Sequence, residues 1–302
     1  MAGTPPKHTA RDFHPEVLRL FDQYVHGAID RRGFLDGAAR FAVGGVTAAT
    51  LLEALSPKFA QAQQVAPNDA RIKSERVEFE SPRGYAKVRG YLVRPASVPS
   101  AGALPTVLVV HENRGLNPHI EDITRRLALA NFIAFAPDAL TPLGGYPGDE
   151  DKARELFPKL DAVKTQEDFI AAAAWLRGVP GASGKLGAVG FCWGGGMCNE
   201  LATRVPALAA SVPFYGIAPP LDAVPRIKAQ MLLFFAENDP RINASWPGYE
   251  TALKTARVPY EAFTYKGTQH GFNNDTTPRY DADAAKQAWQ RTIAFFDRVL
   301  RT

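Results

Sequence analysis

Short apolar runs alternate with helix-length stretches from residue 71 to the end of the chain. The predicted strands are 72–80, 87–94, 106–110, 132–136, 186–191, 207–214, 230–236 and 260–265, and the predicted helices are 120–130, 161–177, 194–204, 249–257 and 283–300. The last six strands are apolar on both faces, which is typical of buried parallel strands. The first two have no helix between them and predict an antiparallel edge. We therefore expect a doubly wound, mostly parallel α/β sheet with helices on both faces.

Composition narrows the class of protein without indicating its activity. The chain has 302 residues, of which 46% are hydrophobic and 22% charged, and this excludes disordered and fibrous proteins. The 35 basic and 31 acidic residues give a formal charge of +4, and the basic residues are spread along the chain, so no nucleic-acid partner is expected. Two cysteines are too few for a disulfide framework. Residues 71–302 contain no linker and are predicted to form one domain.

Residues 1–70 differ in composition and are predicted to be an N-terminal extension. Arg31 and Arg32 are followed by Phe-Leu, a mildly apolar run over 38–55 and an Ala-x-Ala ending at Ala62. This order resembles a bacterial twin-arginine export signal, cleaved after Ala62, and predicts a periplasmic protein. The apolar run is short and interrupted by charge, so no permanent membrane span is expected.

A second interpretation of the extension stays open. The stretch 16–25 is amphipathic and precedes the arginine pair. It predicts an uncleaved helical arm in a cytoplasmic protein, packed either on the domain or on a second subunit of a homodimer.

A strand that runs into a glycine-rich turn and then a helix marks the candidate nucleophile. The segment is Gly190-Phe191-Cys192-Trp193-Gly194. Its context is that of a nucleophile elbow, with cysteine in the place of the more usual serine. The turn is tight, so the positions two before and two after the nucleophile must lack side chains. The sulfur also lies at a helix N-terminus, which favours thiolate over thiol.

Two further strands end in the residues that such a cysteine needs. Asp239 follows one predicted strand, 47 residues after Cys192, and His270 follows the next strand, 31 residues later. Nucleophile, acid and base in this chain order at the carboxyl ends of successive strands predict a Cys-His-Asp triad. Glu237 is the alternative acid. Without these partners, a buried structural cysteine would explain the turn equally well.

The loop after the strand over 106–110 is expected to complete the site. Acyl transfer needs two backbone donors for the oxyanion, one from the residue after the nucleophile and one from this loop. The predicted donors are the N–H groups of Trp193 and Asn113. This chemistry requires neither a metal nor a cofactor.

These motifs resemble those of the dienelactone hydrolase family (carboxymethylenebutenolidases), which are α/β-hydrolases with a Cys-His-Asp triad. The resemblance covers residues 77–300 and rests on the elbow, Glu112, Ala136-Pro137-Asp138, Asp239, and His270 followed by Gly271-Phe272. It implies the α/β-hydrolase fold and a catalytic part for Glu112, because the matching glutamate contacts the resting thiol in the family and helps to generate the thiolate. The alternative for Glu112 is a structural carboxylate bonded to backbone.

The substrate prediction follows from two departures from the family pattern. Members that act on dienelactone bind its carboxylate with two arginines, but the segment after Asp138 has none here and the second position is Asn274. A pair of arginines is the natural clamp for a carboxylate, so dienelactone itself is not expected. The candidate substrate-binding residues are Trp193, Tyr146, Tyr215, Phe272 and Arg114.

The resulting hypothesis is a cysteine-dependent hydrolase that acts on a small carboxylic ester or lactone, neutral or differently charged, through a thioester acyl-enzyme. Two other classes stay open. One is a non-catalytic α/β-hydrolase scaffold that acts as a binding protein, and the other is a thiol redox protein that uses Cys192 and Cys198. The six-residue separation and the lack of a Cys-x-x-Cys motif disfavour the redox protein.

Overall fold

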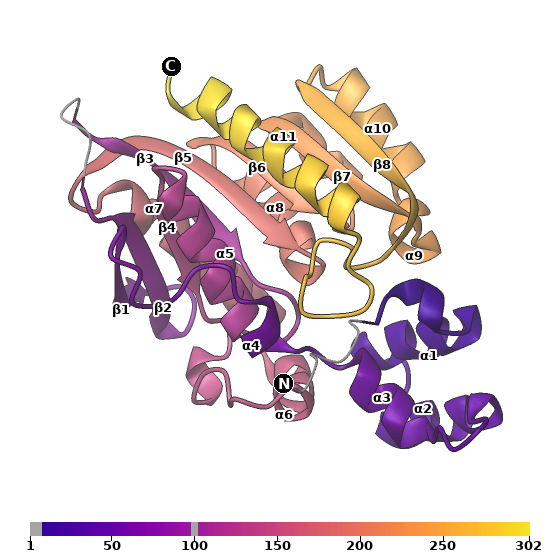
Figure 1. Ribbon diagram of the computed structural model, residues 1–302. Coiled ribbons are helices and arrows are strands. Elements are labelled where there is room, and N and C mark those ends of the chain that lie inside the picture. The colour runs from indigo at the N-terminus through magenta and orange to yellow at the C-terminus, as the bar shows by residue number, and fades with distance from the viewer. Residues whose placement is uncertain (1–7, 98–101) are drawn as a thin grey trace.

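The computed structural model describes residues 8–97 and 102–302, and within them an eight-stranded mixed sheet is flanked by helices (Figure 1). The strands are β1 (Ile72–Ser81), β2 (Ala86–Pro95), β3 (Leu104–Val110), β4 (Ile133–Pro137), β5 (Ala182–Phe191), β6 (Leu208–Phe214), β7 (Gln230–Asn238) and β8 (Tyr260–Gln269). Their order in the sheet is β1-β2-β4-β3-β5-β6-β7-β8. The pairs β1–β2 and β2–β4 are antiparallel and the others are parallel, which confirms the predicted antiparallel edge.

Helices cover both faces of the sheet, as the alternation of elements predicts. Helices α5 (Pro118–Leu129) and α11 (Ala282–Leu300) contribute to one hydrophobic core, and α7 (Ala162–Arg177), α8 (Trp193–Arg204) and α10 (Trp246–Thr255) contribute to the core on the other face. The connections also hold two short helices, α6 (Glu150–Leu156) and α9 (Pro240–Asn243), which the sequence pattern did not indicate. The doubly wound α/β architecture is confirmed.

Strand β8 differs from the prediction in its burial. It lies at the edge of the sheet beyond β7, and most of its side chains are partly or fully exposed. The prediction that it is buried on both faces is wrong, because the side chains of an edge strand have neighbouring strand side chains on one side only. The strand also runs four residues further than predicted, to Gln269, and therefore ends directly at His270.

The N-terminal extension folds into helices with a hydrophobic cluster of their own. They are α1 (Pro15–Val25), α2 (Arg31–Ala38), α3 (Ala48–Leu55) and α4 (Phe59–Ala62). The buried members of the cluster are Phe13, Val17, Leu18, Leu20, Phe21, Tyr24, Phe34, Ala38, Leu52 and Leu55. We call residues 8–62 the arm. Cleavage after Ala62, at the end of α4, stays a prediction.

The arm packs on the domain of its own chain, beside the loop that joins β8 to α11 (Figure 1). The backbone N–H of Lys58 donates to the carbonyl of Thr276 in that loop at 2.8 Å. The carbonyl of Val25, the last residue of α1, accepts from Asn113 and Arg114 in the loop after β3, so α1 ends over the carboxyl ends of the parallel strands, where α/β proteins hold their ligands. In the described part of the chain, no helix has the length and apolar character that crossing a bilayer requires.

Candidate active site

The predicted elbow lies between β5 and α8. Cys192 has φ 57° and ψ −115°, a positive-φ conformation that costs a non-glycine residue about 1–3 kcal/mol. A Cβ atom on Gly190 would lie 2.1 Å from the carbonyl oxygen of Gly194, and one on Gly194 would lie 2.3 Å from that of Val110. Both glycines are therefore steric requirements of the turn that presents the sulfur.

Asp239 and His270 meet at the carboxyl ends of β7 and β8. Nδ1 of His270 lies 2.5 Å from Oδ2 of Asp239, and both residues are buried. Glu237 is exposed, and its carboxylate accepts from the N–H of Gly267 at 2.7 Å. Of the two candidate acids, Asp239 is thus the one that orients the histidine. A ring nitrogen of His270 lies within 4.8 Å of Sγ of Cys192.

The charges around the thiol favour its ionised form. Burial acts to raise the pKa of Cys192, but the positive charges of His270 and His26 outweigh burial and lower it to about 5. Burial likewise acts to lower the pKa of His270, and the Cys192 thiolate and the Asp239 carboxylate raise it to about 10. Between these values the pair rests as thiolate and imidazolium. Cys198 has no such neighbours, and burial alone raises its pKa.

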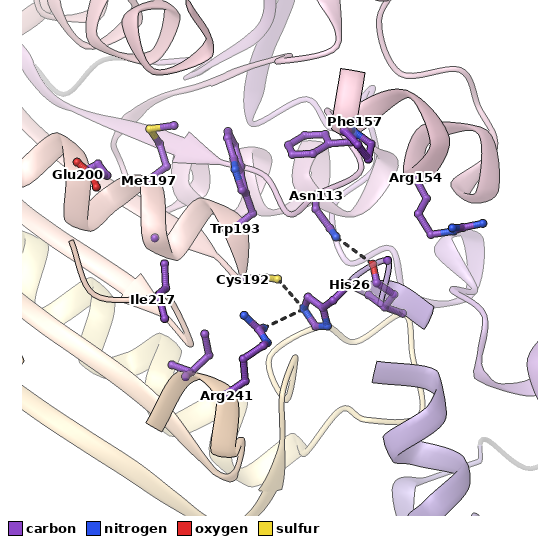
Figure 2. A pocket seen from close by; sticks show the side chains of 15 residues that line it. His26, Asn113, Arg154, Phe157, Cys192, Trp193, Met197, Glu200, Ile217 and Arg241 are labelled. Atoms are coloured by element: carbon purple, nitrogen blue, oxygen red, sulfur yellow. Dashed lines mark hydrogen bonds between the residues drawn. The ribbon is translucent and has the colours of Figure 1, made fainter. Parts of the chain in front are cut away.

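The arm brings a second histidine to the thiol, which sequence reasoning missed. Nε2 of His26, the residue after α1, lies 3.3 Å from Sγ of Cys192 (Figure 2). Its ring meets that of His270 edge to face, with centroids 4.8 Å apart. The contact with Cys192 joins residues 166 apart in the chain, and the stretch around His26 shows no motif that could have indicated it.

Polar side chains of the domain hold the end of α1 in place. The carbonyl of Val25 accepts from Nδ2 of Asn113 and from Nη2 of Arg114, both at 3.0 Å. Arg279 lies 3.4 Å from the carboxylate of Asp22, one turn before His26. The side chains of Asn113 and Arg114 therefore bind the arm, and the oxyanion role of the Asn113 backbone N–H stays a prediction.

Two cavities reach Cys192. The larger, of about 520 Å³, is lined mainly by apolar side chains: Val25, His26, Gly27, Asn113, Arg154, Phe157, Pro158, Cys192, Trp193, Gly196, Met197, Glu200, Ile217, Arg241 and Ile242 (Figure 2). The smaller, of about 60 Å³, is more polar, and Glu112, Arg114, Cys192, His270 and Asn274 are among its lining residues. Trp193, one of the predicted oxyanion donors, lines the larger cavity, and Asn113 lines both.

Glu112 lies in the smaller cavity and is bound to Asn274. Nδ2 of Asn274 donates to Oε2 of Glu112 at 2.9 Å. The partner of the carboxylate is thus a side-chain amide from the loop after His270 rather than backbone. Asn274, which stands where the family pattern has an arginine, ties Glu112 to that loop.

The remaining predicted substrate-binding residues have different surroundings. The ring of Trp193 stacks on His111 at 5.4 Å and forms one wall of the larger cavity. Tyr215, Phe272 and Tyr146 line neither cavity. Tyr215 and Phe272 are buried, and the ring of Tyr215 packs on that of His270 at 4.9 Å. The hydroxyl of Tyr146 donates to Glu150 at 2.9 Å. Tyr215 thus packs against His270, and Phe272 packs against Tyr215.

The two imidazoles and the thiolate also form a donor set that a soft divalent metal accepts. A guanidinium nitrogen of Arg241 lies 3.0 Å from Nε2 of His26, the nitrogen that would bind such an ion (Figure 2). A positive charge at that point opposes a second cation. The arrangement therefore fits proton transfer better than metal binding.

A mostly parallel sheet with an elbow after β5 and an acid and a histidine at the ends of later strands defines an α/β-hydrolase. The model of the dienelactone hydrolase family matches residues 88–300, and that of a YqhI-like family matches residues 5–43. The chain belongs to the dienelactone hydrolase family and is a hydrolase of the ester and lactone class. His26 lies outside the part that matches the hydrolase family.

Similar proteins agree with this assignment. The "Putative carboxymethylenebutenolidase" of Saccharolobus solfataricus is 32% identical over 250 residues, which cover 71% of this chain and 95% of that protein. The "Putative hydrolase fragment YghX" of Escherichia coli K12 is 52% identical over 116 residues, 38% of this chain and 97% of the fragment. The crystal structure of a "Putative Dienelactone Hydrolase" from Klebsiella pneumoniae has a TM-score of 0.65 and 29% identity, and covers 75% of this chain and 99% of its own.

Proposed function

We propose that the protein hydrolyses neutral carboxylic esters or lactones through a thioester on Cys192, with His270 and Asp239 completing the triad. The observation that carries the proposal is the elbow thiol held next to the Asp239–His270 pair. A thiolate is the form of cysteine that attacks a carbonyl, and the lowered pKa of Cys192 supplies it at neutral pH.

The reaction divides into two acyl transfers. Sγ of Cys192 attacks the carbonyl carbon, and the oxyanion is bound by the backbone N–H groups of Trp193 and Asn113. The C–O bond then breaks, and the leaving oxygen takes a proton. Water cleaves the resulting thioester and restores the thiolate. Glu112 lines the smaller cavity beside Cys192 and His270, and a catalytic part for it there is proposed from the family resemblance.

The lining of the larger cavity supports a neutral substrate. Its walls include Phe157, Trp193 and Met197, which suit an apolar acyl or alcohol group. The arginines that line the two cavities each have a partner: Arg114 donates to the carbonyl of Val25, Arg241 contacts His26, Arg279 pairs with Asp22, and Arg154 lies over the ring of Tyr24. No pair of arginines is therefore free among these residues to clamp a carboxylate.

The test compares Cys192→Ala with Cys198→Ala in the full-length protein. Activity on p-nitrophenyl esters and simple lactones should be lost in the first variant and kept in the second. Mass spectrometry of wild-type protein quenched during turnover should find an acyl group on Cys192. Full activity of Cys192→Ala would sink the proposal.

A further inference from the structure

His26 reaches the thiol from the arm, and neither the family motifs nor the triad gives it a part. We propose that His26 is a further catalytic residue, which transfers the protons of the substrate in the larger cavity while His270 and Asp239 keep Cys192 ionised. The inference rests on the proposed function, because it needs an acyl-enzyme on Cys192.

The two imidazoles are divided between the two cavities. His26 lines the cavity of about 520 Å³, and His270 lines the cavity of about 60 Å³. Of the two, the larger has the size of a small-molecule site, whereas the smaller holds little more than water. A substrate in the larger cavity that presents its carbonyl to Cys192 therefore lies on the same side of the sulfur as His26.

Asp22 makes His26 the second carboxylate-oriented histidine on the same thiol. Nδ1 of His26 lies 2.8 Å from the carbonyl oxygen of Asp22 and 3.3 Å from its carboxylate. These contacts keep Nδ1 as the donor and turn Nε2 to the sulfur (Figure 2). Burial acts to raise the pKa of Asp22, but His26 and Arg279 hold it well below its usual range. The orienting carboxylate thus stays charged.

The proton steps balance around one cycle. The thiolate of Cys192 attacks the carbonyl, and as the C–O bond breaks, the leaving oxygen takes the proton from Nε2 of His26. Neutral His26 then takes a proton from water, and the hydroxide attacks the thioester carbonyl. Cleavage of the C–S bond releases the carboxylic acid and restores the thiolate beside protonated His26 and His270.

The charged groups that face His26 set the pKa of its ring. Burial, His270 and Arg241 oppose the charged ring, whereas the Cys192 thiolate and Asp22 favour it, and the outcome is a raised pKa for His26. When Nε2 has given up its proton, its lone pair can accept from the exposed Arg241. Conversion of the thiolate to a thioester removes the main charge that favours protonated His26, so His26 becomes a better proton donor when the leaving oxygen needs a proton. Once it has given up that proton, it is the free base that deacylation needs.

The test uses full-length His26→Gln with two substrates. Glutamine keeps a polar side chain of similar reach but transfers no proton. A p-nitrophenyl ester has a leaving group that needs no proton, so Cys192 should still be acylated in a rapid burst. Deacylation should fall about 10²–10⁴-fold, the usual range for a lost acid-base group, and the acyl-enzyme should accumulate. With an alkyl ester, acylation itself should fall by a similar factor. Added imidazole should restore turnover in His26→Ala, whose shorter side chain leaves room for it.

Arg31→Ala is the matched control for loosening of the arm. Arg31 lies in the arm and pairs with Asp151 on the domain surface at 2.8 Å, and both side chains are largely exposed. Such a pair contributes little to stability. The kcat of this control should stay within about twofold of wild type, because the variant loses only the Arg31–Asp151 ion pair and leaves His26 in place.

The outcomes separate the two proposals. If wild-type protein forms an acyl group on Cys192 and His26→Gln deacylates at the normal rate, His26 has no catalytic part and the triad proposal stands. A rise in KM alone, or a loss of kcat in His26→Ala that imidazole does not restore, also overturns the inference in favour of a structural role. If Cys192 is never acylated in wild-type protein, the proposed function itself fails.

Discussion

The carboxylate of Asp239 bridges the first turn of α9 and the ring of His270. One oxygen accepts from the N–H of Ile242 at 3.3 Å, and the other lies 2.5 Å from Nδ1 of His270. Glu237, at the end of the same strand, instead accepts from Gly267. The N-terminal turn of α9 thus holds Asp239, rather than Glu237, in position to orient His270.

Asp239→Asn should lower kcat about 10³–10⁴-fold, because an amide lacks the charge that helps to keep His270 protonated beside the Cys192 thiolate and orients the ring wrongly once it is neutral. Glu237→Gln is the matched control and should stay within about twofold of wild type. Steady-state kinetics on one p-nitrophenyl ester measures both. Equal losses in the two variants would contradict the assignment of Asp239.

The rate at which iodoacetamide alkylates Cys192 should follow the lowered pKa of that thiol. A lowered pKa means that thiolate persists as pH falls, so the rate should reach half its plateau near pH 5 rather than near the value of about 8.5 for a free cysteine. His26→Gln removes one lowering charge and should move the midpoint upward. Peptide mapping should find Cys198 unmodified, and equal labelling of both cysteines would refute the ionised resting state.

Gly190→Ala should destabilise the fold, since its Cβ would lie 2.1 Å from backbone that cannot move aside. Overpacking of this kind costs roughly 1–3 kcal/mol or more. Thermal unfolding should report a lower Tm together with lost activity. Gly178→Ala is the control, because its nearest contact would be an ordinary 3.6 Å, and its Tm should change little.

Neutral lactones should be hydrolysed with a kcat/KM at least about tenfold above that of carboxylated analogues of similar size. A carboxylate in this site lacks a paired arginine clamp, and a tenfold preference corresponds to only about 1.4 kcal/mol. A kcat/KM for the carboxylated lactone equal to or above that of the neutral one would count against the explanation.

Intact mass of the protein purified from its native host should show that the arm is retained. Removal of residues 1–62 would take away α1 and His26, and with them one wall of the larger cavity. A mature protein that begins near Gln63 and has full activity would contradict the catalytic part of His26. It would agree with the twin-arginine prediction of a cleaved signal.

The sequence was sufficient to predict the sheet and the elbow because both depend on local patterns. Buried parallel strands are continuous apolar runs, and Gly190 and Gly194 are required by backbone contacts within the turn. The order of Cys192, Asp239 and His270 was equally informative, since successive parallel strands end at one edge of the sheet.

The contacts of the arm could not be predicted in this way. His26 meets Cys192 across 166 residues through the packing of one helix against a loop, and no periodicity encodes that pairing. The sequence was likewise insufficient to predict which aromatic side chains line the cavity. Phe272 stands two residues from His270, yet its ring is buried in the core, because neighbouring residues in a turn face different sides.

The two histidines that ionise Cys192 come from opposite ends of the chain, and this has a consequence for biosynthesis. Translation produces His26 first, then Cys192, and His270 only 78 residues later. Until β8 has been synthesised, the sulfur lacks the charge that most lowers its pKa. A chain whose synthesis has not reached His270 therefore lacks this activating charge, and the nucleophile is complete only once β8 and His270 have joined the sheet.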